Sequence, residues 1–252
     1  MVTTNLFDRS ENRNIVNVKG CFSVLEYNKD ISVSIEQAQL AYFASAMNIR
    51  KRQVIASLNN NSVIIQSGAM QMMLGDVKAG TDIKGAGDFL KKAISSKVTG
   101  ETAIKPKYSG NGHIILEPTY KYIIIEDLAD WNGNMVIDDG LFLASEGTVD
   151  MKVVARTTIS SAIAGGEGLF NTCLFGNGVV VLESPVPQDE LICIDLVDDC
   201  VKIDGSMAIA WSNSLKFTVE RTTKTLIGSA ASGEGLVNTY RGTGRILVAP
   251  IA

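Results

Sequence analysis

The stretch "GGEGLFNTCLFGNGVVVLESP", Gly165–Pro185, decides the fold, because nearly the same text returns near the end of the chain. The second copy is "SGEGLVNTYRGTGRILVAP", Ser232–Pro250, and a weaker third copy, "ETAIKPKYSGNGHIILEP", occupies Glu101–Pro118. Each copy contains a Gly-x-Gly motif, then a short apolar run, then a proline. The motifs begin at residues 110, 176 and 242, so both intervals equal 66 residues. Equal spacing over two steps indicates an internal triplication.

The repeat also extends upstream of these glycines. "VIDDGLFLAS" matches "VKIDGSMAIAWS", and both match "IIQSGAMQMM" more loosely. Their turn glycines, Gly68, Gly140 and Gly205, are 72 and 65 residues apart, so the first copy carries an insertion. We place it at "KGAGDFLKKAISSK", where Asp88 would cap a short helix near residues 87–96.

The repeated segments read as short strands. "TVDMKVVARTTI", "HIILEP", "YKYIIIED", "LKFTVERTTK" and "RILVAP" are rich in β-branched and aromatic residues. The Gly-x-Gly and Asp-Gly dipeptides between them are typical of tight turns, and each closing proline should end a strand. A unit of about 65 residues buries its own face poorly, so neighbouring units must complete the core. The prediction is an all-β chain of three tandem units with one or two short helices.

The front of the chain differs from the rest. "SIEQAQLAYFASAMNIRKRQV" has a capping-box pattern at Ser34 and Gln37 and predicts a helix near residues 35–48. "RQVIASLNNNSVIIQSG" then reads as a hairpin with its turn at Asn59–Asn61. We therefore divide the chain into an N-terminal extension (1–56), unit 1 with its helical insertion (57–121), unit 2 (122–187) and unit 3 (188–252).

Composition narrows the class of protein. The 252 residues are 46% hydrophobic and 20% charged with a net charge of −4, which is an ordinary globular composition and a poor general match for nucleic acid. The first residues lack the apolar core of a signal peptide, and no apolar run is long enough to span a bilayer, so we expect a cytoplasmic protein without membrane insertion. The four cysteines form no C-x-x-C pair and lie in strand-like segments, which favours buried thiols over a redox or metal role; they are Cys21, Cys173, Cys193 and Cys200.

No pattern of catalytic or metal-ligating residues emerges. His113 is the single histidine, so neither a multi-histidine metal site nor a Ser-His-Asp mechanism has support. The "GEG" loops place Glu167 and Glu234 where a carboxylate would oppose a phosphate, which favours turn chemistry over ligand contact. The pairs Asn171-Thr172 and Asn238-Thr239 recur in one context, and recurrence favours a structural hydrogen bond over an active site.

Charged and large apolar clusters have plainer interpretations. Arg50, Lys51 and Arg52 follow the predicted helix, where a solvated cationic terminus is favoured over RNA contact. The acidic stretches lack the spacing of a calcium loop, so soluble turns are favoured over a divalent cation site; they contain Glu126, Asp127, Asp130, Asp198 and Asp199. A last group should pack in the core or at a subunit interface: Met70, Met72, Met73, Trp131 and Trp211.

Several segments together resemble the family named for altered inheritance of mitochondria. They are "DDGLFLAS", "GEGLFNTCLFGNGVVVLES", "MAIAWSNSLKFTVER" and "SGEGLVNTYRGTGRILV", and the resemblance covers about residues 60–250. It implies three tandem β-solenoid units of the double-stranded β-helix class, each like a subunit of the tryptophan RNA-binding attenuation protein. It also implies a homotrimer forming a nine-unit ring, and it brings no catalytic, cofactor or metal residues.

Three functions follow from these observations. The favoured hypothesis is a non-enzymatic ring that acts as a scaffold or interaction platform, with protein partners of unknown identity. The alternatives are a small-molecule-binding module that uses clefts between units and, by fold analogy only, an RNA-binding ring. We expect no cofactor and no nucleic-acid partner under the favoured hypothesis.

Overall fold

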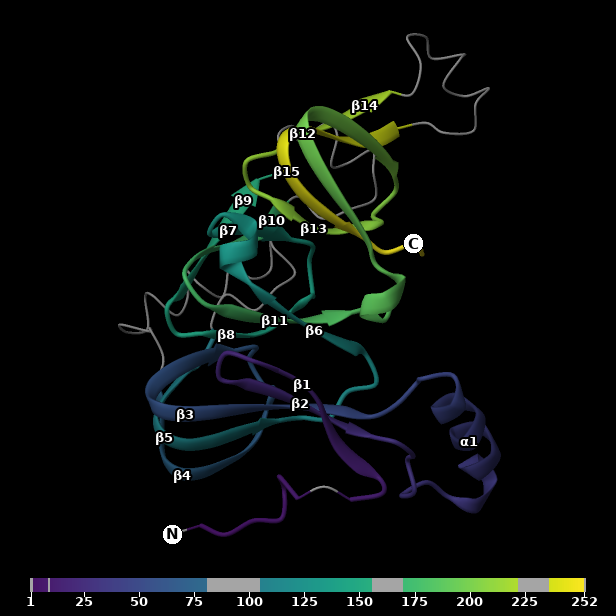
Figure 1. Ribbon diagram of the computed structural model, residues 1–252, viewed down its shortest axis with the longest axis vertical. Coiled ribbons are helices and arrows are strands. Elements are labelled where there is room, and N and C mark those ends of the chain that lie inside the picture. Colours follow the sequence, from purple (N-terminus) through teal and green to yellow (C-terminus); the bar gives the residue numbers. More distant parts are fainter. Residues whose placement is uncertain (1, 9, 81–104, 156–169, 222–235, 252) are drawn as a thin grey trace.

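The computed structural model describes residues 2–8, 10–80, 105–155, 170–221 and 236–251. Within them the chain is mostly β, with two strongly curled, barrel-like sheets stacked one above the other and one short α-helix (Figure 1). None of the helices formed by these residues has both the length and the apolarity needed to cross a bilayer.

The first sheet contains eight strands in the order β1-β2-β3-β8-β11-β6, with β5 pairing both β3 and β4. Its strands are β1 (Arg13–Lys19), β2 (Phe22–Tyr27), β3 (Arg52–Ile65), β4 (Met70–Gly80), β5 (Lys107–Leu116), β6 (Tyr122–Asp127), β8 (Phe142–Glu146) and β11 (Val179–Ser184).

The second sheet contains seven strands in the order β12-β15-β13-β7-β10-β9, with β14 also on β15. Its strands are β7 (Asn134–Ile137), β9 (Val149–Ala155), β10 (Phe170–Gly176), β12 (Ile192–Asp204), β13 (Ala208–Ser212), β14 (Lys216–Arg221) and β15 (Leu236–Val248). The 3₁₀ turns are η1 (Ile35–Gln37), η2 (Leu128–Trp131) and η3 (Gln188–Glu190).

The hairpin predicted at Asn59–Asn61 is wrong. Residues 52–65 form one continuous strand, β3, and both of its halves pair with β5. Asn60 takes a left-handed φ of 54° and makes a bulge that bends the strand without reversing it. Asn132 and Asp198, at φ 53° and 50°, occupy the corresponding bends before β7 and within β12.

The Gly-x-Gly motifs also behave differently from the prediction. Two of the three lie inside continuous strands, β5 and β15, where they bend the strand; the third separates β10 from β11. A Cβ on Gly110 would lie 2.1 Å from the Asp76 carbonyl oxygen, so the neighbouring strand leaves room only for glycine. Tight turns do occur at Gly68, Gly140 and Gly205, as predicted. β5, β11 and β15 each end just before the closing proline.

Strand pairing joins successive segments of the chain at two places. The end of β3 pairs antiparallel with β8, and β7 pairs antiparallel with β13. One core cluster contains residues of both sheets, with Ile124 and Leu182 from the first and Met135 and Leu174 from the second. The two sheets therefore share this core cluster.

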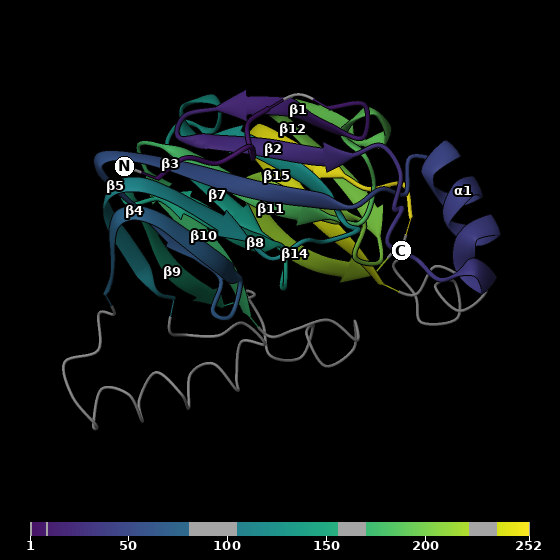
Figure 2. The same ribbon diagram turned by 90° about the horizontal axis from the view of Figure 1, so that it is seen from below.

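The helix predicted near residues 35–48 corresponds to η1 followed by α1 (Ala38–Ala46). Ser34 precedes it but makes no side-chain cap bond, so the predicted capping box is not formed. Figure 2 shows α1 beyond one end of the strands, and its only buried residue is Ser45. The helix predicted near residues 87–96 lies outside the described residues.

Candidate functional site

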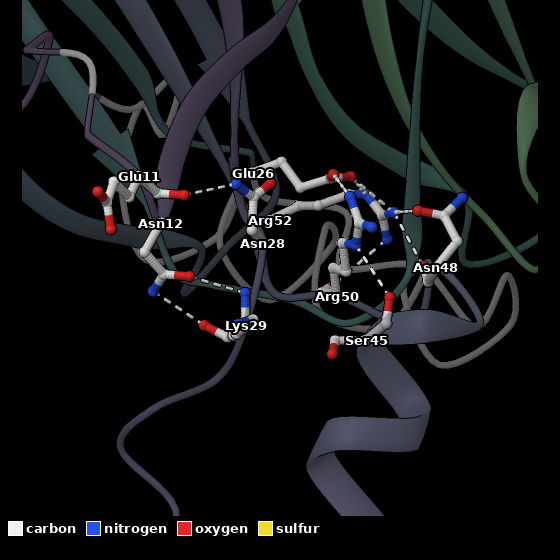
Figure 3. Close-up of polar contacts among 9 residues, drawn as sticks. All are labelled: Glu11, Asn12, Glu26, Asn28, Lys29, Ser45, Asn48, Arg50 and Arg52. Carbon is white, nitrogen blue, oxygen red and sulfur yellow. Dashed lines mark hydrogen bonds and ion pairs between the residues drawn. The ribbon is translucent and has the colours of Figure 1, made fainter.

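Glu26 is the most enclosed acidic side chain of the described residues, and it was missed by the sequence interpretation. It is 8% exposed on β2, and its carboxylate accepts hydrogen bonds from Arg50 Nη1 at 2.8 Å and Arg52 Nε at 2.9 Å (Figure 3). The available signal was a lone glutamate in the apolar strand "FSVLEY" together with "RKR" at 50–52. A buried carboxylate needs such partners, because an unpaired one would lose its hydration.

Arg52 ties four parts of the fold together. Besides Glu26 it donates to the Asn48 carbonyl at 3.1 Å and the Asn48 side chain at 2.9 Å, just after α1. Its guanidinium also lies 4.6 Å from the centre of the Tyr122 ring on β6. Arg50 Nε donates to the Ser45 carbonyl at 3.1 Å, in the last turn of the helix. The predicted solvated terminus is therefore wrong for Arg52, which is 5% exposed.

Lys51 points to a different partner. Its ammonium lies 3.2 Å from an Asp30 carboxylate oxygen, and Tyr120 donates a short hydrogen bond to the other oxygen. The Tyr120 hydroxyl, with smaller contributions from Ser32 and Lys51, holds the pKa of Asp30 below its ordinary value. These contacts fix the loop after β2 against the segment before β6.

A cavity of about 560 Å³ opens beside Glu26 and Arg50. Its wall combines apolar side chains of Leu6, Phe7 and Ile15 with the polar groups of Asn14 and Arg13. Arg13 donates to the Asn5 carbonyl at 2.6 Å, whereas its buried Nε has no partner among the described residues. All of its lining residues lie between Leu6 and Arg50.

His113 has a local role on β5. Its Nδ1 is 3.1 Å from Ser57 Oγ on β3, and its ring lies 4.8 Å from that of Phe7. Across the described ranges, no three His, Cys, Asp or Glu side chains are close enough to hold a metal ion.

The acidic residues of the two stretches act separately. Glu126 accepts a hydrogen bond from the Trp131 indole at 3.1 Å, and Asp127 caps η2 by accepting from the Ala129 amide at 2.9 Å. Asp130 pairs with Lys19 at 3.3 Å. On β12, the Asp199 carboxylate accepts from the Cys200 amide at 2.7 Å, and Asp198 is the bend residue.

The asparagines of the recurring Asn-Thr pairs make structural hydrogen bonds, as the repetition predicts. Asn171 is 3% exposed and donates to Asp138 at 3.2 Å, and Asn238 donates to the Gly205 carbonyl at 2.8 Å. Both reach the turn at the end of a neighbouring strand. Glu167 and Glu234, in the "GEG" loops, lie outside the described residues.

The cysteine prediction holds for part of the set. Cys173 is buried and Cys21 half-buried, but Cys193 and Cys200 are exposed on β12, which pairs with β15 alone among the described strands. Burial, reinforced by the Glu146 carboxylate, raises the pKa of Cys21 to about 12. That thiol therefore stays protonated at neutral pH.

The large apolar residues divide between core and surface. Trp131 and Trp211 are 1% and 4% exposed, and Trp211 packs on Phe217 and Tyr240. Among the described residues, large apolar side chains are also exposed on α1 and on β4. They are Leu40, Tyr42 and Phe43 on α1, Met47 directly after it, and Met72 and Met73 on β4.

Comparison with known proteins agrees with the resemblance found in the motifs. A family model described as Mitochondrial biogenesis AIM24 matches residues 47–251. An uncharacterized protein of Streptococcus pyogenes serotype M6 is 29% identical over 198 residues, covering 75% of this chain and 77% of its own length. A crystal structure of a Streptococcus pyogenes protein superimposes with a TM-score of 0.58 at 26% identity, covering 81% of this chain and 90% of that one. The chain therefore belongs to the Mitochondrial biogenesis AIM24 family.

Proposed function

We propose that this chain is a non-enzymatic subunit of a cytoplasmic homotrimeric ring that acts as a scaffold for other proteins. In this proposal the chain consists of three tandem β-solenoid units that resemble subunits of the tryptophan RNA-binding attenuation protein. The observation that carries it is that the same antiparallel pairing occurs twice within the chain, between β3 and β8 and between β7 and β13.

The bends support the triplication. Asn60, Asn132 and Asp198 each have a left-handed backbone, and each lies opposite a Gly-x-Gly motif or next to the strand that contains it. The turns at Gly68, Gly140 and Gly205 follow eight or seven residues later. A polar residue and a glycine that recur together at matching bends are what a duplicated strand pair requires.

The charged clusters support a structural role. Glu26, Arg50 and Arg52 satisfy one another, and Asp127, Asp130 and Asp199 have separate local partners. An active site instead gathers nucleophile, base and orienting groups around one open position. The described residues offer no such gathering.

Native mass spectrometry tests the ring directly. We expect a species of about three times the 27.0 kDa chain mass at micromolar concentration. A monomer at that concentration would contradict the proposal. Copurification from the native host would then identify what the scaffold holds, and its failure to retain any protein would remove the scaffold role.

The cavity beside Arg50 favours a second candidate, a small-molecule-binding module. Its size suits a small ligand, and its wall combines apolar side chains with the polar residues Asn14 and Arg13. A ligand that binds there must raise the Tm of the wild type and not that of Arg13→Ala. A broad panel of amino acids and nucleotides without any effect would exclude this candidate.

An RNA-binding ring is less favoured by the contacts, because Arg50 and Arg52 already face Glu26. Retention on RNA at low salt with a steep loss on adding salt would support it. The absence of retention at low salt would exclude it.

A further inference from the structure

The two internal junctions use the same register. In each, three residues that follow a left-handed asparagine pair antiparallel with the last three residues of a later strand, β8 or β13. The first junction joins Val63, Ile64 and Ile65 to Glu146, Ser145 and Ala144; the second joins Met135, Val136 and Ile137 to Ser212, Trp211 and Ala210.

Among the described residues, two further strand segments match the two sides of these junctions and have one edge unpaired; one lies on β12 and the other on β4. On β12, the residues at the same distance after the left-handed Asp198 are Val201, Lys202 and Ile203. Val201 lies opposite Tyr240, which is two residues before the Gly-x-Gly motif of the paired strand. Val63 and Met135 are likewise opposite the residue two positions before a Gly-x-Gly motif. Within the described ranges, β12 pairs only with β15, so its outer edge is open.

The matching half lies on β4. In β8 the junction residues begin at Ala144, just after a bulge in the pairing with β11. In β13 they begin at Ala210, just after a bulge in the pairing with β15. The same bulge occurs on β4 between Met70 and Met72, so the corresponding residues are Met72, Met73 and Leu74. Among the described residues, β4 pairs only with β5.

Burial separates the formed junctions from the open one. Ala144 and Ala210 are both 0% exposed, whereas Met72, at the corresponding position, is 41% exposed. Ser145 and Trp211 are 0% and 4% exposed, whereas Met73 is 40% exposed. Two neighbouring methionines in solvent, where the equivalent residues are covered, indicate a surface that a strand covers in the assembled protein.

We infer that β12 of one copy adds to β4 of a second copy in this third junction. Val201, Lys202 and Ile203 pair antiparallel with Leu74, Met73 and Met72 of the partner subunit. The inference rests on the proposed function, since it assigns the surface through which the ring forms. The contact is head-to-tail, and such a contact closes into a ring when the rotations of its copies sum to a full turn.

A charge protects the open edge before assembly. Lys202 lies 3.8 Å from Glu220, and its side chain is 46% exposed. A lysine on an edge strand discourages indiscriminate pairing. Its long apolar stem can still cover Met73 of the partner subunit while the ammonium stays near Glu220.

Disulfide trapping tests the register. The variant M73C/K202C is made in a C193S/C200S background, which removes the two exposed native thiols. Directly opposed residues of antiparallel strands have Cα atoms about 4.5–5.5 Å apart, within the range for a disulfide. Mild oxidation of the full chain should give a covalent ladder on a non-reducing gel, ending at the native oligomer size. M73C alone and K202C alone should give none.

A matched control uses an internal junction. I64C/S145C in the same background has the corresponding pair within one chain. Oxidation should produce a compact monomer that never forms a ladder. This control shows that the register permits a disulfide.

The outcomes separate the two proposals. An oligomeric wild type, a successful I64C/S145C control and no ladder from M73C/K202C would overturn this interface and leave the ring standing. A monomeric wild type without a ladder would overturn both.

A charge substitution gives an independent readout. Met73→Glu changes an exposed side chain, so the subunit should fold, but it places a charge inside the junction. We expect association to weaken at least tenfold in mass measurements over a dilution series. Leu40→Glu on α1, at a residue 73% exposed, should leave the oligomer intact. An unchanged oligomer in Met73→Glu would contradict the inference.

Discussion

Three consecutive basic residues show how far apart the roles of neighbouring side chains can be. Arg50 and Arg52 converge on Glu26, whereas Lys51 points to Asp30. Lys51 and Arg50 directly precede β3, and alternation along this segment sends Lys51 to one side and its neighbours to the other. Sequence alone could identify this cluster as charged and close to a helix end, but its buried partner is 24 residues away from Arg50.

Breaking the buried cluster should be costly. Glu26→Ala leaves two guanidinium groups without their shared carboxylate, and removing one side of a buried ion pair typically costs about 3–5 kcal/mol. Lys51→Ala removes a more exposed pair and should cost about 1 kcal/mol or less. Urea titration followed by circular dichroism measures both free energies of unfolding. Equal losses in the two variants would show that Glu26 does not hold the helix and sheet together.

The Glu220–Arg241 pair predicts an acid-sensitive contribution on β14 and β15. Hydrogen bonds from Arg241 lower the pKa of Glu220 from 4.5 to about 2. Because the folded-state pKa is lower, the contribution is full above pH 4.5 and disappears as pH falls towards 2. Solvent screening makes it small.

The measurement compares the Tm of wild type and Glu220→Gln at pH 6 and pH 3. The wild type should be the more stable at pH 6, and the difference should shrink at pH 3. Arg241→Gln should behave similarly, since it removes the partner that lowers the pKa. A Tm difference that grows on acidification would contradict the prediction.

At the scale of elements, long strands that bend are the characteristic feature. β3, β5, β12 and β15 run through their bends and pair along both halves. The sequence motifs identified the right residues, but we predicted chain-reversing turns where the strands only bend. A left-handed asparagine or a glycine is equally typical of a bulge and of a hairpin turn, and only the strand pairing shows which of the two structures is present.

Alanine substitutions of the glycines at two strand bends should lower the free energy of unfolding by different amounts. A Cβ at Gly110 would meet a backbone oxygen at 2.1 Å, whereas at Gly242 the nearest atom is 3.8 Å away. Both alanines must accept a positive φ, at a cost of about 1–3 kcal/mol. Gly110→Ala should lose clearly more, because β4 must also move away. Chemical denaturation measures this, and an equal loss at both positions would mean that close strand approach is unimportant there.

At the scale of the whole molecule, the shared core predicts cooperative unfolding. Trp131 packs in the core cluster that contains residues of both sheets, and Trp211 in a cluster of the second sheet. The variants W131F and W211F each leave one reporter. Because one core cluster contains residues of both sheets, the two fluorescence transitions should share one midpoint with circular dichroism. Separate midpoints would show that the units unfold independently.

The sequence by itself determined the β class, the strand-ending prolines, the turns at Gly68, Gly140 and Gly205, and the family. These depend on local backbone preferences and on repeated motifs, which are visible without a partner. Only the tertiary structure decided that Asn60 bends one strand, that Glu26 is enclosed by arginines, and that Met72 and Met73 on β4 are exposed. The physical reason is that burial and strand pairing are set by residues far away along the chain, which no local pattern specifies.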